Sequence, residues 1–392
     1  MINNSYKEIS SDIIKVIRKF TKKKYVPLHE PTIRNLDITQ VKKNLLSTNV
    51  STSSSDIIKF ENSISKFTNS KHAVAIINGT SSLQLAIKVL DIKHNDEVFI
   101  PSLNYIASSN ATLYCGAIPH YVDIELKNFG IDVKKLEKYI LKNCIHKENK
   151  LINKKTKRSI TAIIPTHIFG AACNIDQILK ISQKYNLKVI EDAAEGLGSI
   201  YKKKHLGTFG HVGVLSFNGN KIITTGGGGA ILTQNKKYYL KALKLAKIAK
   251  KEKNFWDYDY SELGYNFRLP GINASLGLSQ IKNINNLLKR KKIIFNKMNF
   301  LFKKNKNFRL VVQQNNSGSN NWLNNIYIFN SNYSLRNKII NTMLKEGISV
   351  RPVWKLMHKI KYLSIYPKMN LENSVKAEKS LISLPSSPSL IR

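Results

Sequence analysis

The segment LSFNGNKIITTGGGGAIL, residues 215–232, decides how we interpret the chain. An apolar run that ends at Phe217 predicts a buried strand, and a polar turn then delivers one lysine, Lys221. Two threonines, four consecutive glycines and a second apolar strand follow, and such glycines occur where a backbone or a ligand comes close. Lysine forms a Schiff base with an aldehyde, and its pKa falls readily on desolvation. The segment therefore predicts either a reactive lysine or a hairpin whose lysine only caps a loop.

The composition indicates a large globular protein. A chain of 392 residues with 42% hydrophobic residues can bury a sizeable core, and we expect two subdomains. No apolar run reaches membrane-spanning length, and the N-terminus lacks an apolar signal core. The three cysteines lie far apart without the spacing of a metal site, which suits a reducing compartment. We therefore expect a cytoplasmic protein without a membrane partner or a bound metal.

The net charge is unusual, because 63 basic residues stand against 25 acidic residues and give +38. Such a charge is typical of proteins that bind nucleic acid or anionic membranes. The basic residues are nevertheless spread along the chain, and no nucleic-acid motif accompanies them. We favour a compositional bias towards lysine, asparagine and isoleucine, and we expect no nucleic-acid partner. A positive field would still attract anionic small substrates such as sugar nucleotides.

Strands and helices alternate through the first part of the chain. This alternation predicts a large α/β domain with a mostly parallel sheet covered by helices on both faces. The polar, lysine-rich residues 142–157 are expected to form an exposed loop. The expected strands are 73–77, 98–100, 119–122, 160–164, 187–190, 212–217 and 230–232, and the expected helices are 1–24, 56–67, 83–90, 106–114, 133–141 and 175–185.

The pattern changes beyond residue 238 and predicts a smaller C-terminal α+β domain. We expect one long helix at 272–302 and an irregular tail after residue 353. The other expected elements are helices at 236–251 and 334–346 and strands at 310–312, 326–329 and 349–353. We divide the chain into an N-terminal segment (1–48), the large domain (49–255) and the small domain (256–392).

Polar groups follow several expected strands, at the sheet edge where ligands of α/β proteins bind. Asn78-Gly79-Thr80-Ser81 opens a helix and suits a phosphate, although ordinary helix capping explains it equally well. Asp192 directly follows an apolar strand and is either a ligand for a pyridine nitrogen or a helix cap. Tyr105 is either a ring-stacking residue or plain packing. Together with Lys221, these groups match the requirements of pyridoxal phosphate.

With these residues in view, the chain resembles the DegT/StrS-type sugar aminotransferases, which are fold-type-I enzymes that use pyridoxal phosphate. The resemblance rests on motifs from about residue 26 to the C-terminus. They are NGTSSL (78–83), PTHIFG (165–170), EDAAEGLGS (191–199), LSFNGNKIITTGGGG (215–229) and YNFRLP (265–270). VPLHEP (26–31), RPVWKLMH (351–358) and LPSSP (384–388) resemble the branch that makes 4-amino sugars for legionaminic-acid-type nonulosonates.

The resemblance implies a role for each matching residue. Lys221 would be the Schiff-base lysine and general base, and Asp192 would pair with the pyridine nitrogen. Glu195 would lie near the ring hydroxyl, and Tyr105 would stack on the ring. The other implied cofactor residues are Gly79, Thr80, Ser81, Ser216 and Asn218, together with Asn266, which would reach the phosphate of a partner subunit. The implied substrate residues are Arg268 at the same dimer interface, and Trp354 and His358 in the sugar-nucleotide pocket.

Some residues depart from the family pattern. Asn218 stands where several relatives have histidine or an aromatic residue, and Glu195 stands where many have glutamine. The run Gly226 to Gly229 replaces the Gly-Glu-Gly-Gly of many members. Relatives that remove a sugar hydroxyl have histidine in place of the lysine, so Lys221 argues against a dehydratase.

The resemblance implies a homodimer with shared active sites that transfers an amino group from L-glutamate to a nucleotide-linked keto sugar. We expect the acceptor to be UDP-2-acetamido-2,6-dideoxyhexos-4-ulose, and the product to enter legionaminic acid or another surface glycan. The alternatives are a GDP-linked 4-keto sugar of the perosamine type, a 3-keto sugar, and a non-catalytic nucleic-acid-binding protein on the same fold.

Overall fold

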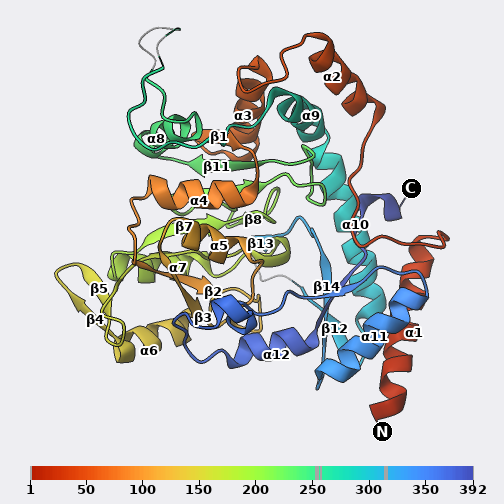
Figure 1. Cartoon of the computed structure of the whole chain (residues 1–392). Coiled ribbons are helices and arrows are strands. Elements are labelled where there is room, and N and C mark those ends of the chain that lie inside the picture. Colours follow the sequence, from red (N-terminus) through yellow and green to blue (C-terminus); the bar gives the residue numbers. More distant parts are fainter. Residues whose placement is uncertain (1, 252–255, 257, 313–316, 392) are drawn as a thin grey trace.

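The computed structural model describes residues 2–251, 256, 258–312 and 317–391. Within these residues, a large sheet forms the centre of the molecule (Figure 1). Its main path has the order β1-β11-β10-β7-β6-β2-β3, and the β4-β5 hairpin extends it from β6. The strands are β1 (His72–Ile76), β2 (Glu97–Pro101), β3 (Ile118–Val122), β4 (Cys144–Lys147), β5 (Lys150–Asn153), β6 (Ser159–Ile163), β7 (Lys188–Asp192), β10 (Val212–Ser216) and β11 (Gly229–Thr233).

The strands of the main path are parallel except β11, which pairs antiparallel with both β1 and β10. Valine and isoleucine side chains alternate along these strands and are buried on both faces, so both faces need a helical layer. One face packs against α4 (Gly79–Val89), α5 (Ala107–Tyr114) and α8 (Lys236–Ala246). The other packs against α3 (Ser55–Thr68), α6 (Val133–Asn143), α7 (Ile175–Lys184) and α9 (Gly271–Lys282).

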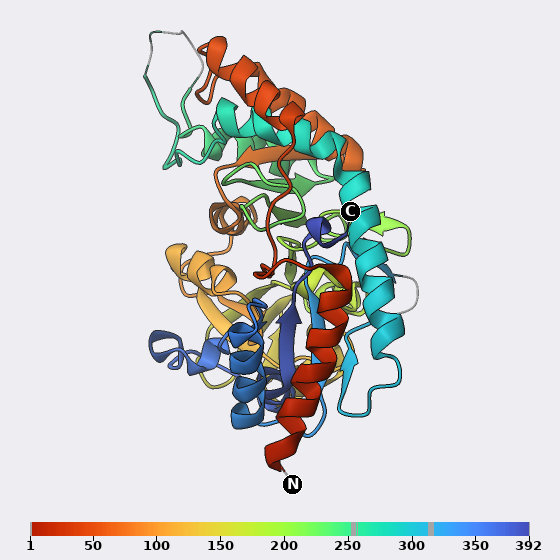
Figure 2. The same ribbon diagram turned by 90° about the vertical axis from the view of Figure 1, so that its right-hand side faces the viewer.

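A second, antiparallel sheet has the order β12-β14-β16-β15 and lies beside the large domain (Figure 1). Its strands are β12 (Phe308–Leu310), β14 (Asn324–Ile328), β15 (Arg351–Pro352) and β16 (Leu381–Leu384). Four helices accompany it: α1 (Ile2–Phe20), α10 (Ile284–Phe302), α11 (Tyr333–Lys345) and α12 (Glu372–Ser380). Figure 2 shows α1 and α10 running along the same side of this sheet, and their apolar residues share one core with α11.

The remaining elements are short or peripheral. Helix α2 (Asn35–Leu46) was not expected, and it packs against α9. A small sheet joins β13 (Ser317–Gly318), β8 (Ile200–Tyr201) and β9 (Lys204–His205), and 3-10 turns occur at Ile168–Gly170, Met357–Lys359, Lys361–Leu363 and Pro388–Leu390. Among the described helices, none combines the length and the apolar character needed to cross a membrane.

The predicted α/β class is confirmed, with a mostly parallel sheet between two helical layers and a smaller α+β part. The expected loop at 142–157 is wrong, because half of its residues form β4 and β5, and β5 pairs antiparallel with β6. Alternate residues of this hairpin are buried, namely Leu151 and Asn153 on β5, while the lysines point outwards. The high lysine content therefore suggested a loop, although β5 is a strand with one buried face.

The single helix expected at 272–302 is wrong as well. The chain forms α9 and α10 with a break at Asn283, because α9 packs on the large domain whereas α10 packs on the small sheet. The break contains no glycine or proline, so the sequence carried no local signal for it. The tail after residue 353 is not irregular, since it supplies α12 and the central strand β16. The helix expected at 236–251 ends at Ala246, and the strand expected at 349–353 is only β15.

Packing crosses both expected domain boundaries. Helix α1, from the segment 1–48, packs on α11 of the small domain, and α9, from the segment 256–392, packs on α2 and α3. Residues 252–255, at the second boundary, lie outside the described residues. The three-part division therefore stays a prediction about the sequence.

Candidate active site

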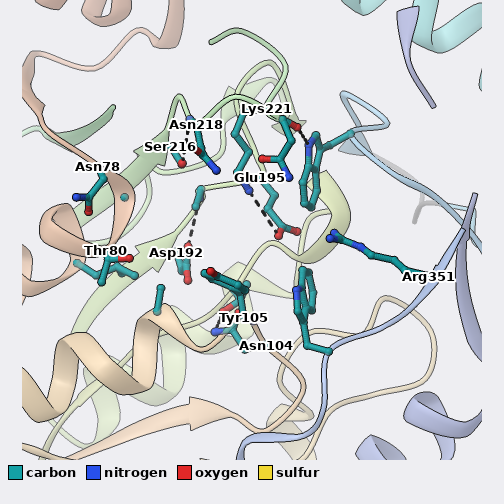
Figure 3. Close-up of a pocket in the computed structure, with 18 residues that line it drawn as sticks. Asn78, Thr80, Asn104, Tyr105, Asp192, Glu195, Ser216, Asn218, Lys221 and Arg351 are labelled. Carbon is teal, nitrogen blue, oxygen red and sulfur yellow. Dashed lines mark hydrogen bonds and ion pairs between the residues drawn. The ribbon is translucent and has the colours of Figure 1, made fainter. Parts of the chain in front are cut away.

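Polar side chains from five strand ends meet at one edge of the large sheet and line a cavity of about 390 Å³. Figure 3 shows Asn78 and Thr80 at one end of this cavity and Arg351 at the other, with Asp192 and Lys221 between them. The strands are parallel, so their carboxyl ends bring these residues together from distant parts of the chain. The lining residues are Asn78, Gly79, Thr80, Leu83, Asn104, Tyr105, Ala107, Thr166, Asp192, Ala194, Glu195, Ser216, Asn218, Asn220, Lys221, Trp322, Arg351 and Trp354.

Lys221 lies in the loop between β10 and β11, after a turn in which its backbone N–H donates to the carbonyl of Asn218 at 3.0 Å. Its side chain is 15% exposed, and its Nζ lies 3.8 Å from Glu195 Oε1 and 3.9 Å from the ring centre of Trp322. Burial lowers the pKa of Lys221, and the charges of Glu195 and Asp192 oppose this effect. β10 and β11 form the expected hairpin, and the lysine lines the cavity, while its reactivity stays a prediction.

Asp192 is the last residue of β7 and is only 5% exposed. Its Oδ2 accepts a hydrogen bond from Ser108 Oγ at 2.7 Å, and its Oδ1 accepts one from the backbone N–H of Ala194 at 3.2 Å. These donors fix the carboxylate at the cavity wall. The preceding residue, Glu191, points to the opposite face, where it accepts from His167 Nε2 and from the backbone N–H groups of residues 207, 209 and 210.

The start of α4 forms the anion end of the cavity. Asn78 caps this helix, because its Oδ1 accepts from the backbone N–H of Ser81 at 2.7 Å. The N–H groups of Gly79 and Thr80 precede the first helical hydrogen bond and are directed away from the helix, where an anion can accept from them. A Cβ on Gly79 would lie 3.1 Å from Ser216 Cβ, so glycine allows the end of β10 to approach closely.

Glu195 closes the cavity behind Lys221. Its Oε2 accepts from the backbone N–H of Phe169 at 2.6 Å, and its Oε1 faces Lys221. Burial raises the pKa of Glu195 to about 7, although the charge of Lys221 and the Phe169 N–H favour the ionised form. Glu195 is therefore protonated in part at neutral pH, and in that form its carboxyl group can donate a hydrogen bond.

Two aromatic residues form the remaining wall. Tyr105 is 54% exposed, and its ring centre lies 6.2 Å from that of Trp354 in an edge-on arrangement. Phe169 stacks on the other side of Trp354 at 5.8 Å and holds its position. Both Tyr105 and Trp354 line the cavity, as expected.

Four expected residues do not line this cavity. Asn266 is exposed after α8, and its role at a partner subunit stays a prediction. Ser81 contributes its backbone N–H to the helix cap, so its side chain is not among the lining groups. His358 lies in a neighbouring groove, where its Nδ1 is 2.7 Å from Ser102 Oγ.

Arg268 also lies outside this cavity. Its buried guanidinium forms a bidentate ion pair with Glu61 of α3, in which Nη2 lies 2.9 Å from Oε2. Glu61 also accepts from the backbone N–H of Ala75 at 2.6 Å, so the pair ties α3 to β1. The expected role of Arg268 near the substrates at a dimer interface stays a prediction.

Five polar or aromatic lining residues were missed: Asn104, Thr166, Asn220, Trp322 and Arg351. Thr166 and Arg351 stand inside quoted motifs, PTHIFG and RPVWKLMH, and both directly follow or belong to strands, which is a signal that could have found them. Asn104 Nδ2 donates to Thr166 Oγ1 at 2.8 Å and so links two strand ends. Trp322 comes from a segment without a clear pattern, and only the fold brings it to Lys221.

The cavity fits pyridoxal phosphate. The helix start offers backbone N–H groups for the phosphate, Asp192 offers a buried carboxylate for the pyridine nitrogen, and Lys221 offers an amine that has no hydrogen-bond partner among the described residues. When bound, the cofactor supplies an aldehyde and an electron-withdrawing ring.

Comparisons with known proteins agree with this fit. The sequence pattern of the DegT/DnrJ/EryC1/StrS aminotransferase family matches residues 31–392. The GDP-perosamine synthase of Escherichia coli O157:H7 is 33% identical over 371 residues, which cover 94% of each chain. A UDP-4-amino-4,6-dideoxy-N-acetyl-beta-L-altrosamine transaminase of Campylobacter jejuni is 31% identical over 342 residues, or 87% of each chain.

Among solved structures, the protein Spr1654 of Streptococcus pneumoniae in its PLP-form superposes with a TM-score of 0.82 at 25% identity. The superposition covers 92% of this chain and 93% of that one, so both domains share the fold. The chain therefore belongs to the DegT/DnrJ/EryC1/StrS aminotransferase family and is an aminotransferase that depends on pyridoxal phosphate.

Proposed function

We propose that this enzyme transfers the amino group of L-glutamate to the C4 keto carbon of a nucleotide-linked 4-keto-6-deoxyhexose. The first candidate acceptor is UDP-2-acetamido-2,6-dideoxyhexos-4-ulose. The observation that carries the proposal is the meeting of Lys221, Asp192 and the α4 anion site around one cavity. An amine without a hydrogen-bond partner among the described residues, beside a buried carboxylate, is suited to proton transfer at carbon.

Each residue has a separate task in the reaction. Lys221 Nζ takes the proton from the α-carbon of the donor, and in the second half-reaction it returns a proton to C4 of the sugar. Because burial lowers the pKa of Lys221, a larger fraction of the amine is in the basic form at neutral pH. Asp192, held by Ser108, provides the negative charge at the far wall, and Trp322 and Trp354 exclude water from the space between them.

The relatives support C4 as the site of amination. The name of the Campylobacter jejuni transaminase contains a 4-amino-4,6-dideoxy sugar, and the Escherichia coli relative is named GDP-perosamine synthase. The relatives differ in the nucleotide, GDP in one and UDP in the other. The motifs VPLHEP and RPVWKLMH favour the UDP-linked 2-acetamido sugar, whereas the identity to GDP-perosamine synthase favours the GDP-linked sugar as the second candidate.

The biological setting follows from this chemistry. We propose that the product enters the synthesis of legionaminic acid or a related surface glycan, and that the enzyme is a cytoplasmic homodimer. All three cysteines are unpaired and buried, which agrees with a reducing compartment. A large set of exposed apolar side chains on α2, namely Leu36, Ile38, Leu45 and Leu46, supports a subunit interface.

The test combines turnover with labelling. Purified enzyme with L-glutamate is offered UDP-linked and GDP-linked 4-keto sugars and a 3-keto sugar, and product formation is followed in each case. In parallel, borohydride reduction and peptide mapping locate the lysine that carries the cofactor. We expect turnover with a 4-keto sugar and labelling at Lys221. Labelling at another lysine, or turnover only with a 3-keto sugar, contradicts the proposal.

A further inference from the structure

Arg351 is the one charged residue lining the cavity for which the described residues provide no hydrogen-bond or ion-pair partner. It belongs to β15 of the small domain, and its side chain is half-buried. Its guanidinium carbon lies 5.6 Å from the ring centre of Trp354, which orients the guanidinium plane. Figure 3 shows the guanidinium pointing into the cavity towards Glu195.

The other charged groups of the cavity differ from Arg351 in this respect. Both oxygens of Asp192 accept hydrogen bonds from the protein. Glu195 accepts from the Phe169 N–H and faces Lys221. Arg351 has five N–H donors, stays protonated at any ordinary pH, and matches the two oxygens of a carboxylate or phosphate. A desolvated guanidinium without a partner is costly, so the cavity is built to receive an anion beside it.

Two anions reach this cavity if the proposed function holds: a carboxylate of the amino donor and the diphosphate of the sugar nucleotide. Position distinguishes them. The guanidinium points towards Glu195 (Figure 3), whose Oε1 lies 3.8 Å from Lys221 Nζ, so Arg351 lies on the side of the cavity that holds the proposed reacting amine. The donor's α-carboxylate is bonded directly to the carbon that loses its proton to Lys221. The diphosphate is attached to C1 of the sugar and is separated from C4 by the sugar ring.

We propose that Arg351 is the binding subsite for the α-carboxylate of the amino donor. This inference rests on the proposed function, because it assumes an amino acid as donor. Arg351 orients the donor so that its α-hydrogen faces Lys221 Nζ, and it selects against amines that lack an α-carboxylate. In the second half-reaction the guanidinium is free for neutral sugar hydroxyls and makes a weaker contact.

The two half-reactions test this inference separately on the holoenzyme. The loss of the cofactor's visible absorbance on addition of L-glutamate reports the first, and its return on addition of the keto sugar reports the second. In Arg351→Gln we expect the second-order rate constant of the first half-reaction to fall about 10- to 100-fold, with a smaller change in the second. Arg351→Lys keeps the positive charge but loses the paired N–H donors of the guanidinium. Its rate constant for the first half-reaction should therefore lie between those of the wild type and Arg351→Gln.

Arg309→Gln is the matched control. Arg309 is also half-buried and stacked on an aromatic ring, that of Tyr327 at 5.3 Å, but it lies outside the cavity. We expect both half-reactions of this variant to match those of the wild type. If its first half-reaction falls as far as that of Arg351→Gln, the loss is structural and the inference is wrong.

Replacing the amino donor tests whether the effect of Arg351→Gln depends on the donor's α-carboxylate. 4-Aminobutyrate is L-glutamate without the α-carboxylate, so the wild type should prefer L-glutamate strongly, and Arg351→Gln should lose that preference. Binding gives a readout without turnover: the dissociation constant of 2-oxoglutarate for the pyridoxal-phosphate form should rise in Arg351→Gln about as much as the rate falls.

Three outcomes overturn the inference: an unchanged preference for L-glutamate in Arg351→Gln, unchanged binding of 2-oxoglutarate, or a loss confined to the sugar half-reaction, which would assign Arg351 to the diphosphate. A wrong assignment of L-glutamate as the donor would give a different result. If the wild type takes nitrogen from L-glutamine or L-alanine only, the glutamate assignment fails, whereas a loss in Arg351→Gln with that donor still supports the α-carboxylate subsite.

Discussion

Two lysines with little solvent exposure, Lys221 and Lys291, both contact Trp322 and differ in their partners. Lys291, on α10, is 1% exposed, and its Nζ donates to the carbonyl oxygens of Trp322 and Ser386 at 3.1 and 2.6 Å. Lys221 faces the ring of the same tryptophan, and its closest carboxylate oxygen, on Glu195, lies 3.8 Å away. Burial lowers the pKa of both amines. Burial alone therefore does not identify the reactive lysine.

The difference lies in the hydrogen-bond partners. The hydrogen bonds of Lys291 have a structural role. They join α10 to the segment before β14 and to the C-terminal segment through the carbonyl oxygens of Trp322 and Ser386. The amine of Lys221 keeps its donors and its lone pair available. Trp322 serves both lysines: its Nε1–H donates to the carbonyl of Asn220 at 2.6 Å and fixes the turn that carries Lys221. We therefore expect the reactive amine to be the one whose hydrogen-bonding capacity the described residues leave unused.

The most direct test of the comparison between Lys221 and Lys291 removes the amine of Lys221. Lys221→Ala should lower turnover by about 10⁴-fold or more, since it removes the proton-transfer group together with the covalent attachment. Lys221→Ala removes the 3.8 Å ion pair with Glu195 but, among the described residues, no hydrogen bond, so far-UV circular dichroism and the urea midpoint should stay close to those of the wild type. Turnover comparable to that of the wild type would show that another lysine, such as Lys291, does the chemistry.

The next largest effect is expected at the carboxylate opposite Lys221. Asp192→Asn keeps the shape of the side chain and its contact with Ser108 but removes the charge, and we expect turnover to fall roughly 10²- to 10³-fold. Ser108→Ala is the control, because it keeps the charge and removes one hydrogen bond. Steady-state rates of the two variants at saturating pyridoxal phosphate provide the measurement. A larger loss in Ser108→Ala than in Asp192→Asn would contradict a role for the charge.

A smaller effect is expected at Glu195, because the ionisation of its carboxyl group sets the charge beside Lys221. Burial raises its pKa from an ordinary 4.5 to about 7, so the folded protein holds a proton that the unfolded chain has lost between these two pH values. The stability that this proton provides is complete below pH 4.5 and is lost as the pH rises through 7. Relative to Glu195→Gln, the cofactor-free wild type should therefore lose about 3 kcal/mol of unfolding free energy over this range.

Urea denaturation of both proteins from pH 5 to pH 8 measures this difference. The glutamine variant retains an acceptor for the Phe169 N–H, so we expect a smaller loss of turnover than in Asp192→Asn. Parallel pH profiles of stability for the two proteins would show that Glu195 does not titrate in this range.

The sequence predicted the part of the site that follows strand ends, and it did so for a physical reason. Asp192 ends β7, Gly79 and Thr80 open the helix after β1, and Lys221 lies in the loop after β10. Parallel strands bring their carboxyl ends, and with them these residues, to one edge. Local order along the chain is enough to place such residues. Their individual roles towards the cofactor stay predictions, since they rest on resemblance.

Residues that depend on packing between distant elements could not be predicted in this way. Trp322 precedes β14, and its ring reaches Lys221 only because the small domain packs on the large one. The break between α9 and α10 has the same origin, because each helix follows a different sheet. The ion pair between Arg268 and Glu61, more than 200 positions earlier in the sequence, is another contact that local sequence order could not predict.

The smallest effect on turnover is expected at Lys291, where only stability should change. Lys291→Met fills a similar volume but leaves the carbonyl oxygens of Trp322 and Ser386 without their donor, so we expect a loss of about 1–3 kcal/mol in unfolding free energy with turnover unchanged.

The pKa of Lys291 is lowered in the folded state, so between that pKa and the ordinary value the unfolded chain binds more protons. The stability of the wild type should therefore rise with pH in this range relative to Lys291→Met. Urea denaturation at neutral and alkaline pH tests both the loss and its sign, and a variant that is fully stable but poorly active would place Lys291 with Lys221 in the reaction.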